Sequence, residues 1–318
     1  MEKEEKKPLI ILTGPTAVGK TAASIGLAKA VGGEIISADS MQVYKEMDIG
    51  SAKITPEEME GVPHHLVDVL EPEEEFNVVR FQELAKEAMK GIYERGHIPI
   101  VVGGTGFYIQ ALLYDIDFTE NETDHTYRKE LEQLAEEKGE EYLHKLLQEA
   151  DPESASQIHC HNVKRVIRAL EFYHQTGTKI SEHNEKEREK EAAYRSAYFV
   201  LTDERGKLYA NIDKRVDQML EDGLVEEVRK LMEMGCKRES TAMQGLGYKE
   251  IIAYLLGENT LDEAVYLIKR DTRHFAKRQL TWFRRERDVI WIEKDKFAYD
   301  NNQILKYMIN ECNAGEEG

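Results

Sequence analysis

The feature that most constrains the fold is the segment 14–21, Gly-Pro-Thr-Ala-Val-Gly-Lys-Thr, which directly follows the apolar run 9–12. The pattern G-x-x-x-x-G-K-[ST] between a buried strand and a helix start is typical of a phosphate-binding loop. Backbone N–H groups and a helix N-terminus there converge on anionic oxygens, the lysine reaches across them, and the last hydroxyl can hold Mg²⁺. The sequence therefore predicts a diphosphate site and leaves open whether that diphosphate carries a nucleoside. The residues expected at the phosphates are Gly14, Pro15, Thr16, Ala17, Val18, Gly19, Lys20 and Thr21, with Thr21 as the metal ligand.

Apolar runs alternate with helical periodicity at both ends of the chain, which is typical of an α/β fold with a parallel sheet. Strands are expected at 9–12, 34–38, 65–69, 98–102, 197–201 and 289–292. Long helices are expected at 76–95, 127–150, 162–176, 212–234 and 261–287. The strand signal disappears between about 119 and 195. We therefore expect a core like that of P-loop NTPases, formed by residues 1–118 and 196–318, with an all-helical domain inserted at 119–195.

The charge of the chain is strongly negative but unevenly distributed. A net charge of −18 argues against a partner rich in phosphate, because Lys and Arg dominate affinity for nucleic acids. Residues 120–151 contain eleven acidic and four basic side chains, whereas residues 154–170 contain three basic and no acidic ones. Residues 269–287 contain eight basic and two acidic side chains. Since electrostatic contact is local, at a Debye length of about 8 Å, these two basic stretches could line a polyanion path or be ordinary solvated helix faces.

Composition also predicts the compartment. No stretch approaches the roughly 20 apolar residues that a membrane span needs, and the N-terminus is charged where a targeting segment would be apolar or rich in arginine. We therefore expect a cytoplasmic protein that makes no membrane contact. The three cysteines, Cys160, Cys236 and Cys312, are widely spaced and contain no C-x-x-C pair. This favours free, incidental thiols over a disulfide framework or a zinc site.

Two further strand ends carry residues suited to chemistry. Asp39 follows the second expected strand, at the same sheet edge as the phosphate loop, and is a candidate general base. A magnesium ligand or a simple turn cap are the alternatives for this carboxylate. The strand 98–102 runs into Gly103-Gly104-Thr105-Gly106, where an ATPase would commonly carry an acidic residue. Thr105 offers a hydroxyl and a helix N-terminus to an anion, or merely caps the helix.

Six sequence blocks, taken in order, together resemble the bacterial tRNA dimethylallyltransferase family nearly end to end. The blocks are the loop at 14–21, Asp-Ser-Met-Gln-Val-Tyr-Lys-Glu-Met-Asp-Ile-Gly-Ser-Ala-Lys at 39–53, Val-Gly-Gly-Thr-Gly-Phe-Tyr at 102–108, Arg-Val-Ile-Arg-Ala-Leu-Glu at 165–171, Gln-Gly-Leu-Gly-Tyr-Lys-Glu at 244–250 and Lys-Arg-Gln-Leu-Thr-Trp-Phe-Arg at 277–284. Departures are small: Val18 stands where relatives often have Ser, and Val163 where an Asp is common. Jointly the blocks are far more specific than the phosphate loop alone.

The resemblance implies that dimethylallyl diphosphate alkylates N6 of adenosine 37 in the anticodon loop of tRNAs that read codons starting with U, releasing pyrophosphate. It implies Asp39 as the base, Thr105 and Arg215 as donors to the diphosphate, and Mg²⁺ as the cofactor of a monomer. An intrahelical pair with Asp222 is the plain alternative for Arg215. The residues implied to contact the tRNA anticodon stem-loop are Asp39, Ser40, Met41, Gln42, Thr105, Arg128, Lys164, Arg165 and Arg168. Phe107, Tyr108, Tyr248 and Trp282 are candidates for stacking on bases, or are core residues.

Other functions remain open from the sequence. A P-loop small-molecule kinase would use ATP at the same loop, but should carry a magnesium-binding acid after the strand 98–102. A noncatalytic RNA-binding regulator with a nucleotide switch would not consume dimethylallyl diphosphate. An enzyme that prenylates free adenine nucleotides would have no use for a helical insertion with a basic stripe.

Overall fold

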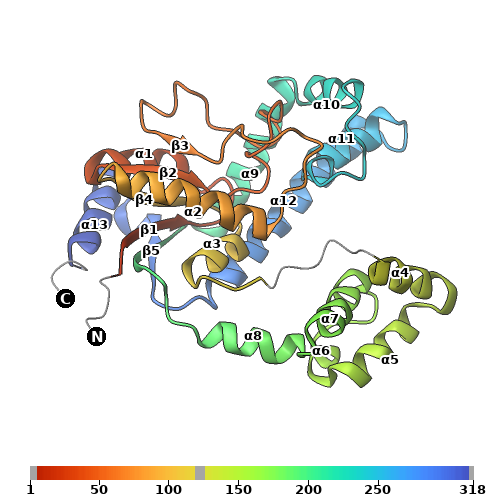
Figure 1. Ribbon diagram of the computed structural model, residues 1–318. Coiled ribbons are helices and arrows are strands. Elements are labelled where there is room, and N and C mark those ends of the chain that lie inside the picture. The colour runs from red at the N-terminus through yellow and green to blue at the C-terminus, as the bar shows by residue number, and fades with distance from the viewer. Residues whose placement is uncertain (1–5, 119–125, 315–318) are drawn as a thin grey trace, which may run out of the picture. The chain divides into compact units, whose positions relative to one another are not determined.

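The protein is described by a computed structural model that covers residues 6–118 and 126–314 (Figure 1). The chain divides into two compact units, Met1–Leu113 with Ala193–Gly318, and Tyr114–Ala192. The division falls a few residues before the boundaries expected at 118/119 and 195/196, and the first of those borders residues 119–125, which lie outside the described part. Among the described residues, no helix combines the length and the apolar character required to cross a bilayer.

The first unit is built on a six-stranded sheet in the order β3-β2-β4-β1-β5-β6, in which the paired strands are parallel. The strands are β1 (Pro8–Thr13), β2 (Gly33–Ser37), β3 (His64–His65), β4 (Ile98–Gly103), β5 (Arg195–Thr202) and β6 (Val289–Glu293). Ile10 and Leu12 of β1 pack into a core with helix residues, while the alternate residues Leu9 and Ile11 are equally buried. Burial on both faces is what a parallel sheet covered by helices requires, and it confirms the expected α/β fold.

Helices of the first unit cover the sheet and extend beyond it. They are α1 (Lys20–Val31), α2 (Val78–Glu94), α3 (Gly106–Leu113), α9 (Arg205–Glu221), α10 (Leu224–Glu233), α11 (Tyr248–Leu255), α12 (Leu261–Phe283) and α13 (Asn301–Ala314), with short 3₁₀ turns η1 (Ala242–Gln244) and η2 (Lys294–Phe297). Helices α1 and α13 pack together against the strands, and α2 packs on β2 and β4 with α3 beside it (Figure 1).

Two expectations about these elements were wrong. The strand expected at 65–69 ends after His65, because Leu66 and Asp68 adopt φ values of 61° and 55°, which turn the backbone out of the sheet. The helix expected at 212–234 is two helices, α9 and α10, which are separated at Gly223 with φ 103°. A left-handed residue cannot continue an α-helix, so hydrophobic periodicity alone overestimates the helix length there.

Glu34 joins several elements at the end of the sheet opposite to the phosphate loop. Its buried carboxylate accepts hydrogen bonds from Arg95 Nε at 2.8 Å and Arg95 Nη2 at 2.7 Å. Ring nitrogens of His65 and His97 lie 2.7 Å from its two oxygens. The hydrogen bonds from Arg95, supported by those to the histidines, lower the pKa of Glu34 to about 2 despite its burial. The ionised carboxylate therefore ties β2, β3 and the segment before β4 together.

The second unit, within its described residues, is all-helical. Its helices are α4 (Thr126–Lys138), α5 (Glu140–Ala150), α6 (Pro152–Gln157), α7 (Val163–Thr176) and α8 (Ile180–Glu189). The helix expected at 127–150 is broken at Gly139, whose φ is 85°. Leu131, Leu143 and Leu147 are fully buried against α7, and these contacts form a small separate core. Asp151 is also fully buried, and it accepts from the N–H and hydroxyl groups of both Ser154 and Ser181.

Candidate functional site

The candidate site lies at the carboxyl edge of the sheet. Thr13, the last residue of β1, pairs with Gly103, the last of β4, and Ser37, the last of β2, pairs with Val102. Three neighbouring strands thus end level with one another. Ligand sites of open parallel sheets lie at this edge, so the chain segments that leave these strands are brought together.

The phosphate loop between β1 and α1 is held closed by side chains from distant elements. The ammonium group of Lys20 donates to the carbonyl oxygens of Gly14 and Pro15, at 2.9 Å each. The amide oxygen of Gln279 accepts the N–H of Thr16 at 2.9 Å, and Lys294 Nζ donates to a loop carbonyl at 3.2 Å. Lys20 is therefore folded back onto the loop, with α1 starting at its own residue. Neither Gln279 nor Lys294 could be assigned a role from the sequence, since each contacts the loop across more than 250 residues.

Asp39 reaches this edge because two strand ends approach unusually closely. Ala38 donates its N–H to the carbonyl oxygen of Val102 at 2.8 Å. A Cβ atom at Gly103 would lie 2.3 Å from the carbonyl oxygen of Ala38, so only glycine allows this approach. Asp39 Oδ1 then accepts from the backbone N–H groups of Met41 at 2.8 Å and Gln42 at 3.4 Å. The turn-cap role considered for this carboxylate is thus present, and it orients the side chain.

Lys20, Asp39 and Arg215 lie within electrostatic reach of one another. Burial lowers the pKa of Lys20 to about 8; the negative charge of Asp39 opposes this shift, and the positive charge of Arg215 adds to it. Burial also lowers the pKa of the Arg215 guanidinium on α9, while Asp39 and Glu58 raise it. The structure thus brings together three residues that are almost two hundred positions apart. Asp222, the alternative partner of Arg215, accepts a hydrogen bond from Gln218 at 2.9 Å.

Thr105 lies between β4 and α3, next to the turn that carries Asp39. Its N–H donates to the carbonyl oxygen of Ala38 at 3.3 Å, and its own carbonyl accepts from the N–H of Tyr108 at 2.9 Å. The carbonyl of the preceding Gly104 accepts from Gln279 Nε2 at 3.0 Å, so the Gln279 amide links this turn to the phosphate loop. Thr105 therefore occupies the start of α3, as its helix-capping alternative requires, at the same edge as Asp39.

The segment that follows Asp39 is clamped by one carboxylate. Glu227 of α10 accepts the backbone N–H groups of Asp48 at 2.9 Å, Ile49 at 2.7 Å and Gly50 at 3.0 Å. The hydroxyl of the fully buried Tyr248 donates to the same carboxylate at 2.8 Å. These contacts of Glu227 could not be predicted from the sequence, because an acidic residue on a charged helix face is usually exposed to solvent.

Within the same segment the expected RNA-contacting residues have internal partners. The Gln42 side chain donates to the carbonyl oxygens of Ala52 at 3.2 Å and Ser51 at 3.5 Å. A Cβ atom at Gly245 would lie 2.4 Å from the sulfur of Met41, so the chain of the block 244–250 passes directly against this side chain. Ser40 and Met41 are half-buried. Residues 39–42 thus form a turn whose conformation is held by contacts within the protein.

Among the expected stacking residues, two are core residues. Tyr108 stacks on Phe81 with ring centroids 4.7 Å apart, and Tyr248 is fully buried. Phe107 is 41% exposed and meets Trp282 edge to face at 6.2 Å. Only Phe107 and Trp282 of the four thus offer ring surface near this edge.

Both basic stretches expected from the sequence are on helices. Lys164, Arg165 and Arg168 are exposed on α7 of the helical unit. Arg128 of α4 makes a bidentate pair with Glu171 at 2.9 and 2.7 Å. The second stretch belongs to α12 in the other unit. Side chains of that helix and the residues after it line an open groove: His274, Lys277, Arg278, Thr281, Trp282 and Arg285.

The phosphate loop fits the magnesium ion that the resemblance implies. Thr21 is the second residue of α1 and is exposed beside Lys20. Mg²⁺ prefers to keep waters and substrate phosphate oxygens among its ligands, so one protein hydroxyl is an adequate anchor for it. The chemistry of the loop therefore suits a diphosphate bound together with Mg²⁺.

The fold and the loop define a class: the chain is a P-loop α/β protein that carries a carboxylate, Asp39 after β2, at the same sheet edge as the phosphate loop after β1, with β4 between the two strands. Comparison with known proteins narrows this class. The sequence model of the family described as IPP transferase matches residues 42–286, and that described as Isopentenyl transferase matches residues 7–70. The chain belongs to the IPP transferase family, which confirms the resemblance found in the sequence.

Individual relatives match over nearly the whole chain. The tRNA dimethylallyltransferase of Lachnoclostridium phytofermentans is 64% identical over 95% of this chain and 96% of its own. The crystal structure of the full-length tRNA isopentenylpyrophosphate transferase from Bacillus halodurans is similar with a TM-score of 0.73 and 43% identity, covering 98% of this chain and 99% of that one. A eukaryotic dimethylallyltransferase, whose structures show it acting on tRNA, matches with a TM-score of 0.77 and 32% identity over 90% of this chain and 74% of that one. The kinase alternative is not favoured, because these relatives are named for transfer of a dimethylallyl or isopentenyl group and not of a phosphate.

Proposed function

We propose that the protein transfers the dimethylallyl group of dimethylallyl diphosphate to N6 of adenosine 37 in tRNAs that read codons starting with U. The observation that carries this proposal is the grouping of Lys20, Asp39 and Arg215 at one sheet edge, in a chain of the IPP transferase family. Two cations suited to a diphosphate stand there beside one carboxylate suited to an amine. A kinase needs the cations, but it has no use for a base facing an adenine.

The diphosphate is the leaving group, and the loop supplies donors to it. As the allylic C–O bond breaks, negative charge grows on the diphosphate oxygens, which positioned cations and N–H groups stabilise. We assign this role to Lys20, Arg215, Thr105 and the N–H groups of the loop. Mg²⁺ held by Thr21 supplies further charge neutralisation when bound. Lys20 must leave its two loop carbonyls to reach the phosphates, so ligand binding and loop geometry are coupled.

We assign to Asp39 the role of general base, which accepts the proton that N6 of adenine loses. The new C–N bond forms between the allylic carbon and N6 of adenine, and the amine must then lose one proton. The carboxylate of Asp39 accepts it, through Oδ2 rather than the Oδ1 that accepts from Met41 and Gln42. Pyrophosphate leaves with the electron pair of the broken C–O bond, so charge and atoms balance.

The tRNA must present an extruded base, since adenine inside a stacked loop is out of reach of the carboxylate. We propose that the turn 39–42 together with Thr105 holds the extruded base, and that Phe107 and Trp282 offer stacking surface. The basic face of α7, with Arg128 beside it, and the groove on α12 are proposed to contact phosphates of the anticodon stem-loop. We further propose a monomer, because every group assigned here comes from one chain, and a cytoplasmic enzyme, because its proposed substrate is tRNA.

The test is a single-turnover reaction with Mg²⁺, unmodified tRNA and either dimethylallyl diphosphate labelled in its allyl group or ATP labelled in its γ-phosphate. Allyl label should enter the tRNA at adenosine 37 with release of pyrophosphate. A third reaction offers AMP in place of tRNA and should give no product. Transfer of phosphate from ATP, or of the allyl group to AMP in preference to tRNA, contradicts the proposal.

A matched pair of variants tests the base. Asp39→Asn keeps an oxygen that can cap the turn, so it separates proton transfer from structure, and it should slow the chemical step by about 10²–10⁴-fold. Asp68→Asn, at an exposed position where Lys53 retains Asp48 as a partner, is the control and should react at the normal rate. A near-normal rate for Asp39→Asn removes Asp39 from the base role.

A further inference from the structure

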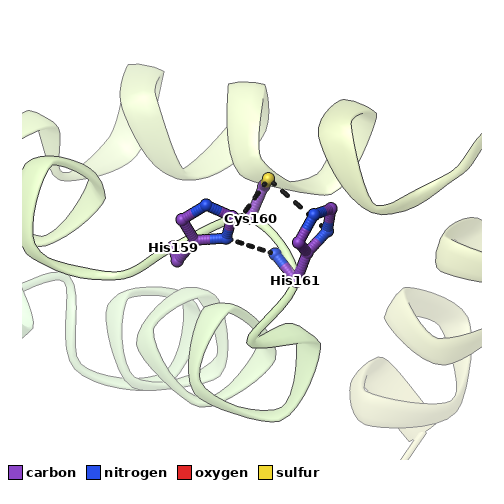
Figure 2. Close-up of side chains that lie close together, drawn as sticks. All are labelled: His159, Cys160 and His161. Atoms are coloured by element: carbon purple, nitrogen blue, oxygen red, sulfur yellow. Dashed lines mark hydrogen bonds between the residues drawn. The ribbon is translucent and has the colours of Figure 1, made fainter.

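A turn in the helical unit gathers nitrogen and sulfur ligands far along the chain from every residue assigned to the diphosphate. His159, Cys160 and His161 form the connection between α6 and α7 (Figure 2). One ligand atom of each residue lies within 4.8 Å of those of the other two. The cysteine spacing that argued against a zinc site considers cysteines alone and overlooks histidines that flank one of them. Cys160 is a free thiol, as expected.

The distances between these atoms match those of a tetrahedral metal site. The Cys160 sulfur lies 3.7 Å from Nδ1 of His159 and 3.8 Å from Nδ1 of His161 (Figure 2). Zinc bonds of about 2.3 Å to sulfur and about 2.0–2.1 Å to nitrogen, at a tetrahedral angle, place the two ligand atoms roughly 3.5 Å apart. The sulfur is therefore within a few tenths of an ångström of the spacing that an ion shared with either ring requires, and the ligand nitrogens of the two rings lie within 4.8 Å of each other.

The turn is held in place by its own backbone and by helix α5. The N–H of Asn162 donates to the carbonyl oxygen of His159 at 2.8 Å, which closes the turn. Nε2 of His144 on α5 lies 2.8 Å from the carbonyl oxygen of Ile158, the residue directly before the turn, and so holds Ile158 against α5. One helical turn earlier on α5, Glu140 makes a close ion pair with Nδ1 of His161. Because Glu140 contacts Nδ1, the same nitrogen that lies 3.8 Å from the sulfur, it competes with an ion for this nitrogen unless the carboxylate itself turns to become the fourth ligand.

We propose that His159, Cys160 and His161 bind a zinc-class divalent ion, with Glu140 as the fourth ligand. Soft thiolate and imidazole donors select zinc over magnesium, so this ion is distinct from the Mg²⁺ expected at the phosphate loop. A metal ion binds the thiolate form of Cys160 and the neutral form of each histidine, so binding releases the protons that these side chains carried. The bound ion ties the start of α7 to α5.

The test uses the full-length protein without a histidine tag, stripped of metal with a chelator. Titration with Co²⁺, a spectroscopic substitute for Zn²⁺, should give one equivalent of binding with a thiolate-to-metal charge-transfer band, which Zn²⁺ then abolishes. Cys160→Ser should lose the band, and Glu140→Gln should lower the affinity for Zn²⁺ by about tenfold. Affinity should fall as the pH falls, because the ligands must lose protons.

Cys312→Ser and His274→Ala remove a cysteine and a histidine elsewhere in the chain, and both should keep the band. Circular dichroism of the metal-free variants establishes that each is folded before titration. Absence of a thiolate band in the parent protein overturns the proposal, as does its persistence in Cys160→Ser. These readouts do not depend on prenyl transfer.

Discussion

The lowered pKa of Lys20 predicts how diphosphate binding depends on pH. Burial brings this pKa to about 8, whereas the ordinary value for lysine is 10.5. A bound diphosphate favours the ammonium form and raises the pKa again. Below pH 8 the free protein already carries the proton; above it, binding must take one up. The affinity for dimethylallyl diphosphate should therefore be constant up to about pH 7.5 and then fall, approaching a tenfold loss per pH unit, so that it is about tenfold weaker at pH 9.

The assay is calorimetric or fluorescence titration of dimethylallyl diphosphate without tRNA, so that no turnover occurs, at constant ionic strength between pH 7 and 9.5. Lys20→Arg is the matched control, because a guanidinium group keeps its charge throughout this range. The variant will bind more weakly, since the loop carbonyls of Gly14 and Pro15 are spaced for an ammonium group. Its affinity should nevertheless show no loss between pH 7.5 and 9.

The comparison of the two slopes decides the matter. Any other group that titrates in this range contributes equally to both proteins and cancels in the comparison. If the parent protein and Lys20→Arg lose affinity in parallel, Lys20 is not the titrating group. If neither loses affinity up to pH 9.5, the lysine is charged throughout and the effect of burial has been overestimated.

Three further changes have defined outcomes. Glu34→Gln should lower the free energy of unfolding at pH 7 by about 2 kcal/mol. The pKa of Glu34 is lowered to about 2 in the folded protein, so the ionised carboxylate stabilises the fold above pH 4.5. This stabilisation is lost as the pH falls toward 2. Urea unfolding should show the difference from the parent narrowing at pH 3, and a constant difference would contradict the assignment. In the parent protein three backbone N–H groups donate to the two carboxylate oxygens of Glu227, whereas Glu227→Gln leaves only one oxygen to accept them. The turn 39–42 should therefore loosen, and single-turnover transfer should slow by about tenfold. The affinity for the diphosphate should be unchanged. Joint replacement of the exposed basic face of α7 by alanine should weaken tRNA binding and reduce the slope of log affinity against log salt by at most about three; an unchanged slope would show the face to be merely solvated. That variant is Lys164→Ala, Arg165→Ala and Arg168→Ala.

Much of the sheet could be predicted because its strands are apolar runs bounded by turn residues. The phosphate loop and Asp39 could be located for the same reason, since parallel strands bring their carboxyl ends to one edge. The strand at His64–His65 was misjudged in length, because left-handed residues such as Leu66 carry no distinctive side chain. Arg215 entered only through the family resemblance, as nothing local on α9 distinguishes it from other arginines.

The contacts that shape the site could not be predicted, because they join side chains to backbone groups far away in sequence. Gln279 accepts from the phosphate loop and donates to the turn before Thr105, and Glu227 collects three N–H groups of one loop. Backbone groups are present at every residue, so no pattern of residue types reveals such a partner. The chain order of these residues gives no hint either, since the fold alone decides which helix passes each loop.

The strong negative charge of the chain and its action on a polyanion are compatible because charge acts locally here. At a Debye length of about 8 Å, a phosphate that contacts the groove on α12 is influenced mainly by the basic side chains that line this groove, and more distant acidic residues are screened. Each basic face alone is small, so an RNA that touches only one of them makes few contacts with its phosphates. We infer that affinity builds only when an RNA engages a basic face and also offers a base to the turn 39–42. Selectivity for one loop shape then follows from the requirement for both contacts, and not from the net charge of the chain.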